Sequence, residues 1–410
     1  MATPPRRMPL WTTGAPASWP KPPAEMTVST LAEIEACPRR WALSMASYPE
    51  LWSERGYPPR VHLKTLAGSV VHIVLETVTR ELARAGCPSV QDASAVAVLK
   101  SLGGLSKVVG QTIDQLMDRL AANPRSNRVR DHFTRSLRAQ APELRGRVQT
   151  MLCRRHMPRS AAGPAPTGRP RFRGPLANGV HCEIELRAPQ LLWKGKADLL
   201  ALAPDMCEIT DFKTGELSDE HRFQVRTYAL LWSRDNELNP TRRLADRLIL
   251  AYATGDIEVP APTQEELQEL ERELARRGSA AREAVSNEPP EARPDAQRCR
   301  YCGVRQLCDA YWLAETQHCL GAVPNDVRLT DAELTITGRH GPTSWNTIVT
   351  LSPCVQKGTY ALLRTTGEVD LRAGDRLRLL DVSITVHTGE DNTRTAILTY
   401  GTLSEKYAVI

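Results

Sequence analysis

Two aspartates placed symmetrically about a short turn are the feature that most constrains this fold. Asp198 lies in the run Leu191–Leu202 and Asp211 in the run Cys207–Lys213, and both runs alternate between apolar and polar residues. Such alternation, bounded by turn residues, predicts two strands. If Pro204-Asp205 forms the turn, residues that face each other across the hairpin sum to 409, so Asp198 lies opposite Asp211.

This pairing predicts a metal site. Two like charges that face each other across a ladder destabilise it unless a cation lies between them. Mg²⁺ suits such a place, because it prefers one or two carboxylates together with water and phosphate oxygens. Lys213 projects from the same face as Asp211, where it can steady an attacking water or the charge that develops on phosphorus.

Two alternatives stay open from these residues alone. A Pro-Asp turn suits type I geometry, which is not the preferred turn of a two-residue hairpin, so the register can slip. The hairpin can also be a plain surface element, whose two aspartates and two lysines form exchangeable salt bridges.

Three motifs together resemble one nuclease family. Asp198 followed thirteen residues later by Asp211-Phe212-Lys213-Thr214-Gly215 resembles the PD-(D/E)XK signature in its RecB-like form. Gly68-Ser69-Val70-Val71-His72 resembles the Gly-x-x-x-His helix of that family, and Gln224-Val225-Arg226-Thr227-Tyr228 resembles its Gln-x-x-x-Tyr motif. Each motif is weak alone, and their shared order and spacing carry the resemblance.

The resemblance implies a fold and a site. The fold is α/β, with a restriction-endonuclease-like core in which helices flank a mixed sheet. The implied metal ligands, for Mg²⁺ or Mn²⁺, are His72, Asp198 and Asp211. The implied catalytic group is Lys213, acting with Asp198, Asp211, Gln224 and Tyr228, of which the last two position the lysine or the DNA backbone. A glutamate on the strand before the hairpin is also frequent in the family, and Glu183 and Glu185 are both candidates.

Four of the ten cysteines have ligand-like spacing. Cys299-x2-Cys302-x5-Cys308 needs a fourth ligand for tetrahedral zinc or for a cubane cluster, and Cys37-Pro38 lies at the other end of the nuclease region. The cysteine spacing alone fits a zinc site at least as well as an iron–sulfur cluster. Resemblance to RecB-like nucleases of the AddB and CRISPR-associated types implies a [4Fe-4S] cluster that acts as a staple. We expect the remaining cysteines to be buried thiols.

Charge is unevenly distributed along the chain, whose formal net charge is +6. Between Arg125 and Arg173 there are thirteen arginines and two acids, Asp131 and Glu143. This stretch is either a solvated, flexible segment or an arm that contacts phosphates. No apolar run approaches the roughly 18 residues of a membrane span. No secretory signal is visible at the start, so we expect a reducing, cytoplasmic location and no membrane contact.

Changes in composition and in the spacing of apolar residues along the chain predict the domain organisation. We expect a disordered tail over residues 1–25, a nuclease domain over 26–320 with a basic helical insertion at about 90–175, and a small β domain over 325–410. Within the nuclease domain, 27–48 is predicted to be one helix. Gly374-Asp375 before a long alternating strand resembles an OB-fold. Its aromatic residues are candidates for base stacking or for core packing: Trp345, Tyr360, Tyr400 and Tyr407.

Together these features predict a Mg²⁺- or Mn²⁺-dependent deoxyribonuclease that processes single-stranded DNA or duplex ends, as an exonuclease in DNA repair or anti-phage defence. No P-loop sequence occurs in the chain, so a helicase or defence-complex partner would supply any motor. Two other hypotheses remain: a catalytically silent iron–sulfur DNA-binding scaffold, and a zinc-stabilised structural protein.

Overall fold

A computed structural model describes residues 11–52, 56–155, 157–158, 173–321, 329–366, 370–388 and 394–409. The chain divides into two compact units. One unit comprises residues 22–35 and 60–283, and the other comprises 1–21, 36–59 and 284–410. Among the described residues, no helix has both the length and the apolar character needed to cross a membrane.

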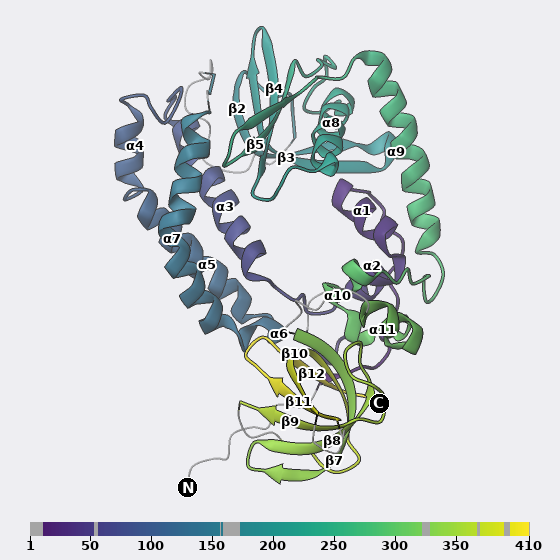
Figure 1. Cartoon of the computed structure of the whole chain (residues 1–410). Helices are drawn as coiled ribbons and strands as arrows, with labels where there is room; N and C mark the ends of the chain where they lie inside the picture. Colours follow the sequence, from purple (N-terminus) through teal and green to yellow (C-terminus); the bar gives the residue numbers. More distant parts are fainter. Residues whose placement is uncertain are drawn as a thin grey trace. The chain divides into compact units, whose positions relative to one another are not determined.

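The unit of residues 22–35 and 60–283 contains a mixed five-stranded sheet in the order β2-β3-β4-β5-β6 (Figure 1). The strands are β2 (Gly179–Ala188), β3 (Trp193–Ala203), β4 (Met206–Lys213), β5 (Arg247–Tyr252) and β6 (Asp256–Val259). Only β4 and β5 pair in parallel, and the other neighbours are antiparallel. This agrees with the mixed sheet expected for the family. Strand β6 was not predicted.

Helices cover this sheet. Helices α3 (Leu63–Arg84) and α8 (Asp219–Arg234) contact its strands. Helices α1 (Val28–Ala36), for most of its length, and α9 (Gln264–Ala284) belong to the same unit. Helix α8 packs on β2, β3, β4 and β5. Helix α3 contributes to an apolar core that also includes Phe212 of β4 and Ile249 of β5. Because successive side chains of a strand point to opposite faces, Asp211 and Lys213 project away from the core that holds Phe212.

The basic stretch before the sheet is largely helical. It forms α4 (Ala95–Ser101), α5 (Leu105–Ala121), α6 (Pro124–Asn127) and α7 (Arg130–Cys153). Helices α5 and α7 pack on each other and on α3, and apolar residues such as Ile113 and Leu137 are fully buried between them. This part is therefore a packed helical layer. The Pro-, Gly- and Arg-rich stretch from Ser160 to Leu176 is predicted to be a loop or linker, and its residues up to 172 lie outside the described part of the chain.

The predicted single helix 27–48 is wrong, because the chain forms two helices there. Helix α1 ends at Ala36 and α2 (Pro38–Met45) begins directly after Cys37. Cys37 is the extended N-cap of α2, with φ −166° and ψ 106°. Proline at the first helical position suits a new helix but disfavours a helical conformation in the residue before it.

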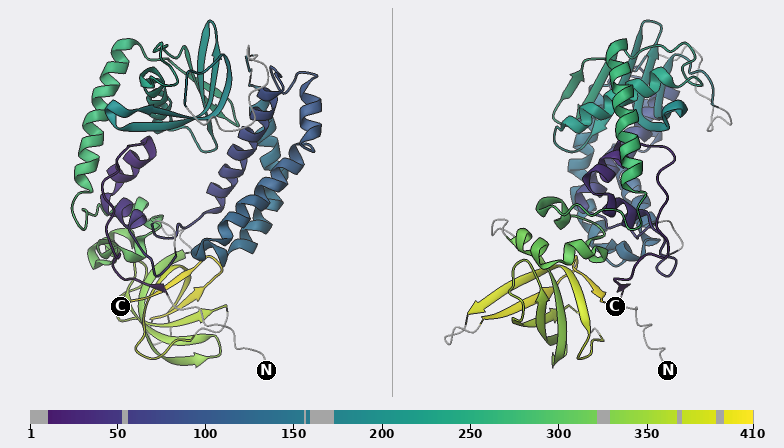
Figure 2. Two further views of the ribbon diagram at one scale, coloured as in Figure 1. Left: turned by 180° about the vertical axis from the view of Figure 1, so that it is seen from behind. Right: turned by 90° about the vertical axis from the view of Figure 1, so that its right-hand side faces the viewer.

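In the other unit, β-strands form a closed ring (Figure 2). They are β7 (Leu329–Gly341), β8 (Ser344–Leu351), β9 (Tyr360–Thr365), β10 (Arg376–Thr388), β11 (Arg394–Tyr400) and β12 (Glu405–Ala408). The order is β7-β8-β9-β11-β10, and β10 pairs again with β7 to close the ring. The pair β9–β11 is parallel. Strand β12 adds to β10 outside this ring.

Part of the predicted disordered tail is also a strand. Trp11–Thr12 forms β1, which pairs in parallel with Tyr407 and Ala408 of β12. Residues 1–10 lie outside the described part of the chain. Of the four aromatic residues considered for base stacking, Trp345 and Tyr407 are buried and Tyr400 packs against the ring's core, whereas Tyr360 is 69% exposed.

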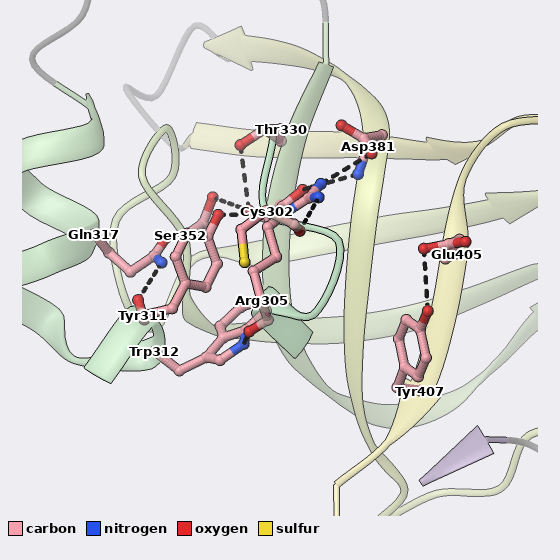
Figure 3. A network of polar contacts seen from close by, with 11 residues as sticks. Cys302, Arg305, Tyr311, Trp312, Gln317, Thr330, Ser352, Asp381, Glu405 and Tyr407 are labelled. Atoms are coloured by element: carbon pink, nitrogen blue, oxygen red, sulfur yellow. Dashed lines mark hydrogen bonds and ion pairs between the residues drawn. The ribbon is translucent and has the colours of Figure 1, made fainter. Parts of the chain in front are cut away.

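A buried arginine joins the cysteine segment to this ring (Figure 3). Arg305, 2% exposed, lies between Cys302 and Cys308 in sequence and donates to both carboxylate oxygens of Asp331 on β7. It also donates to Asp381 Oδ2 on β10 at 2.9 Å. Tyr311 Oη donates to Asp331 Oδ2 at 2.7 Å. The cysteine segment and the ring therefore share one buried polar network.

Candidate active site

The hairpin has the register that a Pro204-Asp205 turn predicts. Paired residues run from Ala203 opposite Met206 to Leu199 opposite Thr210. The ladder stops there. At the next position Phe212 N–H donates to the Asp198 carboxylate at 2.6 Å. The Asp198 carboxylate, beside Asp211, therefore accepts the hydrogen bond that a backbone carbonyl group would accept if the ladder continued.

A third carboxylate lies on the other side of Asp198. In the β2–β3 ladder Cys182 pairs with Leu199 and Ile184 with Ala197, so Glu183 lies opposite Asp198. Glu183 itself is not paired and has a φ of +55°, a conformation that costs a non-glycine residue energy and often marks functional sites. Glu183, Asp198 and Asp211 thus form a row across three adjacent strands.

The row resolves the choice between the two glutamates. Glu185 pairs with Lys196 in the ladder, and its carboxylate contacts Arg187. The charge of Glu183, in contrast, adds to burial and to the charge of Asp211 in raising the pKa of Asp198. The Glu183 side chain also forms an ion pair with Lys196. Of the two candidates, only Glu183 belongs to the row.

A chain of polar contacts leads from Asp211 to helix α8. Lys213 Nζ lies 2.6 Å from Asp211 Oδ2 and donates to Gln224 Oε1 at 2.7 Å. Gln224 Nε2 donates in turn to Tyr228 Oη at 2.5 Å. Gln224 and Tyr228 are one helical turn apart and thus on the same face of α8. The structure brings together these sequence-predicted residues around one lysine ammonium group.

Glycine at position 195 allows the tyrosine ring to approach the sheet. A Cβ at Gly195 would lie 2.7 Å from Tyr228 Cε1 and 2.9 Å from Leu231 Cδ1, both shorter than van der Waals contact. Tyr228 is buried, which raises the pKa of its hydroxyl group, so the group stays protonated. It can therefore donate a hydrogen bond while accepting one from Gln224.

Burial and mutual repulsion shape the electrostatics of the carboxylates. Burial, followed by the charge of Asp211, raises the pKa of Asp198 well above its ordinary value. Burial also raises the pKa of Asp211, although the adjacent Lys213 opposes this effect. Asp211 Oδ2 is buried and, apart from its ion pair with Lys213, has no hydrogen-bond partner of normal geometry. Both groups would be stabilised as carboxylates by an added cation.

His72 approaches this row from helix α3. Its Nδ1 lies 3.7 Å from Asp198 Oδ2, and its side chain is 34% exposed. Burial lowers the pKa of His72, which favours the neutral imidazole that a metal requires. One turn earlier, a Cβ at Gly68 would lie 2.8 Å from Thr214 Oγ1. The Gly68–His72 spacing therefore lets α3 pass closely beside the end of β4.

Two further polar groups of the site were missed from the sequence. His221 Nδ1 lies 2.7 Å from Tyr252 Oη, and the charges of Lys213 and Asp211 both influence the pKa of His221, which burial lowers. His221 precedes Gln224 by three residues on α8, which places both on one helix face. That spacing was the available signal for His221. Tyr252 ends β5 and carries no motif.

The four cysteines with ligand-like spacing line one pocket. Cys37 comes from the start of α2, and Cys299, Cys302 and Cys308 come from α10 (Ala296–Arg300) and the turns that follow it. The backbone N–H groups of Arg293 and Asp295 donate to the sulfurs of Cys37 and Cys299 at 3.5 and 3.3 Å. Burial, with a smaller contribution from the nearby Cys302 and Cys37 sulfurs, raises the pKa of Cys308 to about 11.

Both groups of residues fit the metals that the motifs imply, although neither is closed around an ion. Among the residues that the structure describes, no three His, Cys, Asp or Glu side chains already lie close enough to hold a metal together. The crowded and buried carboxylates of Asp198 and Asp211 suit a hard divalent cation. The four thiols, with N–H groups aimed at sulfur, suit a thiolate-ligated centre.

Known proteins identify the family. A model of the PD-(D/E)XK nuclease superfamily matches residues 25–309. The chain belongs to this superfamily. The match spans the row of carboxylates, α8 and all four spaced cysteines, and it supports a metal-dependent nuclease.

Other comparisons add little to this assignment. A search of curated proteins found no match. Among solved structures, SSO0001 matches with 18% identity and a TM-score of 0.21. The match covers 32% of this chain and 60% of SSO0001, so the chain spans less than two thirds of that protein.

Proposed function

We propose that this PD-(D/E)XK protein is a Mg²⁺- or Mn²⁺-dependent deoxyribonuclease. The observation that carries the proposal is the row Glu183–Asp198–Asp211 beside Lys213. Three carboxylates on adjacent strands repel one another and favour a cation between them. A divalent cation bound there would stabilise charge on a phosphoryl group and lower the pKa of a water bound to it.

The protein's own groups would hold the reacting atoms. Asp198 and Asp211 supply buried oxygens, and Glu183 and His72 complete the set of candidate ligands. An ammonium group has three N–H donors, and Gln224 accepts one from Lys213. Another is free to orient the attacking water or a phosphate oxygen. Tyr228 holds Gln224, and Gln224 holds the lysine, so the two act as positioning residues.

Substitutions of similar size that remove charge test this site. Asp211→Asn, Glu183→Gln and Lys213→Met should each abolish cleavage of end-labelled single- and double-stranded DNA in Mg²⁺ or Mn²⁺, because each removes a ligand or the ammonium group. Asp205→Asn in the exposed turn and Glu185→Gln on the same strand as Glu183 are the controls, and both should retain activity. Equal activity of Glu183→Gln and Glu185→Gln would contradict the assigned row. DNA left intact by the wild-type protein would favour the catalytically silent scaffold.

We further propose that Cys37, Cys299, Cys302 and Cys308 bind a [4Fe-4S] cluster, as in nucleases of the AddB and CRISPR-associated types. Cys37 joins α2 to the segment after α9, so the cluster would staple two distant parts of the chain. Anaerobically purified protein should contain about four iron and four sulfide. Cys37→Ala should lose them, whereas Cys354→Ala, at an exposed cysteine outside the pocket, should not. Zinc without sulfide would overturn the proposal.

The closed ring supports an OB-like assignment for β7–β11. The ring is a five-stranded barrel with the strand order β7-β8-β9-β11-β10, and β10 pairs with β7. Neighbours in the barrel are thus not always consecutive in sequence, as in OB-folds. Such domains bind single strands. We therefore propose that DNA ends or single strands are substrates, in repair or anti-phage defence in the cytoplasm, alongside a helicase or defence-complex partner. Product ladders from end-labelled substrates distinguish exonuclease from endonuclease action.

A further inference from the structure

A groove leads away from Lys213 along the insertion helices. It is bordered by α3, by the chain after β4, by the end of β5, and by α5 and α7. His72 and Lys213 line it together with Arg119 of α5 and Arg147 of α7. Its volume is about 1540 Å³, which exceeds the roughly 300–1,000 Å³ of pockets for small molecules. The groove is thus sized for part of a polymer.

Charge in the groove favours an anion. Its charged lining residues, apart from His72, are four cations and one carboxylate: Lys64, Arg119, Arg147, Lys213 and Glu216. Lys64 and Arg119 are exposed, and neither has an ion-pair partner among the described residues. Among the described residues, Arg147 forms an ion pair with Glu143 on its own helix, at 2.6 Å with both side chains exposed, an interaction that a phosphate can replace at little cost.

The groove offers little for recognising bases. Among its described lining residues, Tyr252 is the one phenol ring and no Phe or Trp is present. The Tyr252 hydroxyl contacts His221. Strand binding by stacking relies on several aromatic side chains, whereas phosphate binding relies on Arg and Lys. The groove is therefore suited to a backbone and not to a sequence.

We infer that the insertion helices α5 and α7 bind the phosphate backbone of a nucleic acid strand through Arg119 and Arg147 and guide it to Lys213. This inference rests on the proposed nuclease function and deepens it. It assigns the basic helical layer to substrate binding and predicts contacts that do not depend on base sequence.

The salt dependence of binding tests the inference. Full-length protein in EDTA, which prevents metal-dependent cleavage, would be titrated into fluorescently labelled DNA of mixed sequence, as single strand and as duplex, between about 50 and 200 mM salt. Arg119→Ala/Arg147→Ala should bind more weakly and reduce the slope of log K against log salt by about 1 for each arginine. Arg135→Ala/Arg138→Ala is the control, because it removes the same two charges from exposed positions of α7 outside the groove.

The outcomes separate the inference from the function. The melting temperature of Arg119→Ala/Arg147→Ala should match that of the wild type, so that weaker binding reports the lost charges and not unfolding. If the groove variant keeps the wild-type slope while the protein still cleaves DNA, the inference is overturned and the function stands. Equal slope changes in both double variants would also overturn it, by showing a general charge effect. A wild-type protein that neither binds nor cleaves DNA would overturn the function itself.

Discussion

Asp198 is the central residue in the row of three carboxylates. It accepts a hydrogen bond from Phe212 N–H, faces Asp211 on one strand and Glu183 on the other, and is largely buried. Burial and these carboxylates together raise its pKa. In the metal-free protein, Asp198 therefore either keeps a proton or is repelled by the neighbouring carboxylates. Metal binding would release the proton and relieve the repulsion.

We predict that Asp198→Asn stabilises the metal-free protein while abolishing metal-dependent cleavage. A carboxyl group whose pKa rises on folding binds more protons when folded. Its contribution to the free energy of unfolding therefore falls as pH rises from its ordinary 3.8 through the raised pKa. Asparagine can still accept from Phe212 N–H without the charge. In EDTA, the melting temperature of the Asp198→Asn variant should exceed that of the wild type, and the difference should be larger at pH 8 than at pH 5. Each kcal/mol gained should raise the melting temperature by about 2–4 °C.

If the melting temperature of Asp198→Asn at pH 8 is equal to or below that of the wild type, the neighbouring carboxylates do not destabilise the folded protein through Asp198. Asp205→Asn, at an exposed turn position, provides the matched control and should be neutral at both pH values.

At the scale of elements, helix α3 and strand β4 depend on one close contact. Gly68 lies against Thr214, the residue after Lys213, and a Cβ there would be 2.8 Å from Thr214 Oγ1. Threonine is branched at Cβ and stiff, so the added methyl group must shift either the helix or the end of β4. Either shift alters the distance between His72 and Lys213.

We predict that Gly68→Ala lowers cleavage by about tenfold or more, since a displacement of about 1 Å can cost 10²-fold. The free energy of unfolding should change little, because alanine favours the helix by about 1 kcal/mol and offsets the clash. Gly110→Ala in α5, where nothing lies within 4 Å of the added Cβ, should stabilise the protein and leave activity unchanged.

A second substitution provides the critical check on this contact. Gly68→Ala/Thr214→Ala removes the oxygen that the new methyl group meets, so it should recover most of the lost activity. If the double variant is as impaired as the single one, the contact with Thr214 is not the reason for the glycine.

At the scale of the whole molecule, the cysteine segment and the β ring of one unit share buried charge. Arg305 is 2% exposed and contacts Asp331 and Asp381, which come from β7 and β10. Removing one partner of a buried ion pair leaves the others uncompensated. The segment that carries Cys302 and Cys308 is therefore held by the ring's own strands.

We predict that Arg305→Met lowers the free energy of unfolding of this unit by about 3–5 kcal/mol and reduces iron retention. Arg376→Met is the control: its side chain is 54% exposed and its partner Glu333 keeps a second arginine, Arg378. That variant should cost less than about 1 kcal/mol. Calorimetry of the full-length protein measures both, and equal costs would contradict the role of Arg305.

Local sequence was sufficient to predict the hairpin register and the order of the motifs. Pro204-Asp205 sets the turn, and the period of two then determines which residues face each other. The spacing of Gln224 and Tyr228 likewise places them on one helix face without any tertiary information. The four spaced cysteines were also recognisable, since their ligand spacing is local for three of them.

Only the tertiary structure decided which side chains from different elements meet. Glu183 and Glu185 are two residues apart on one strand, so the alternation of side chains predicts the same face for both. The pairing with β3 and the positive φ at Glu183 distinguish them. The pairing of β9 with β11 and the groove along α5 and α7 likewise depend on long-range contacts. Sequence periodicity reports which face of an element is apolar, but it carries no information about which distant element covers that face.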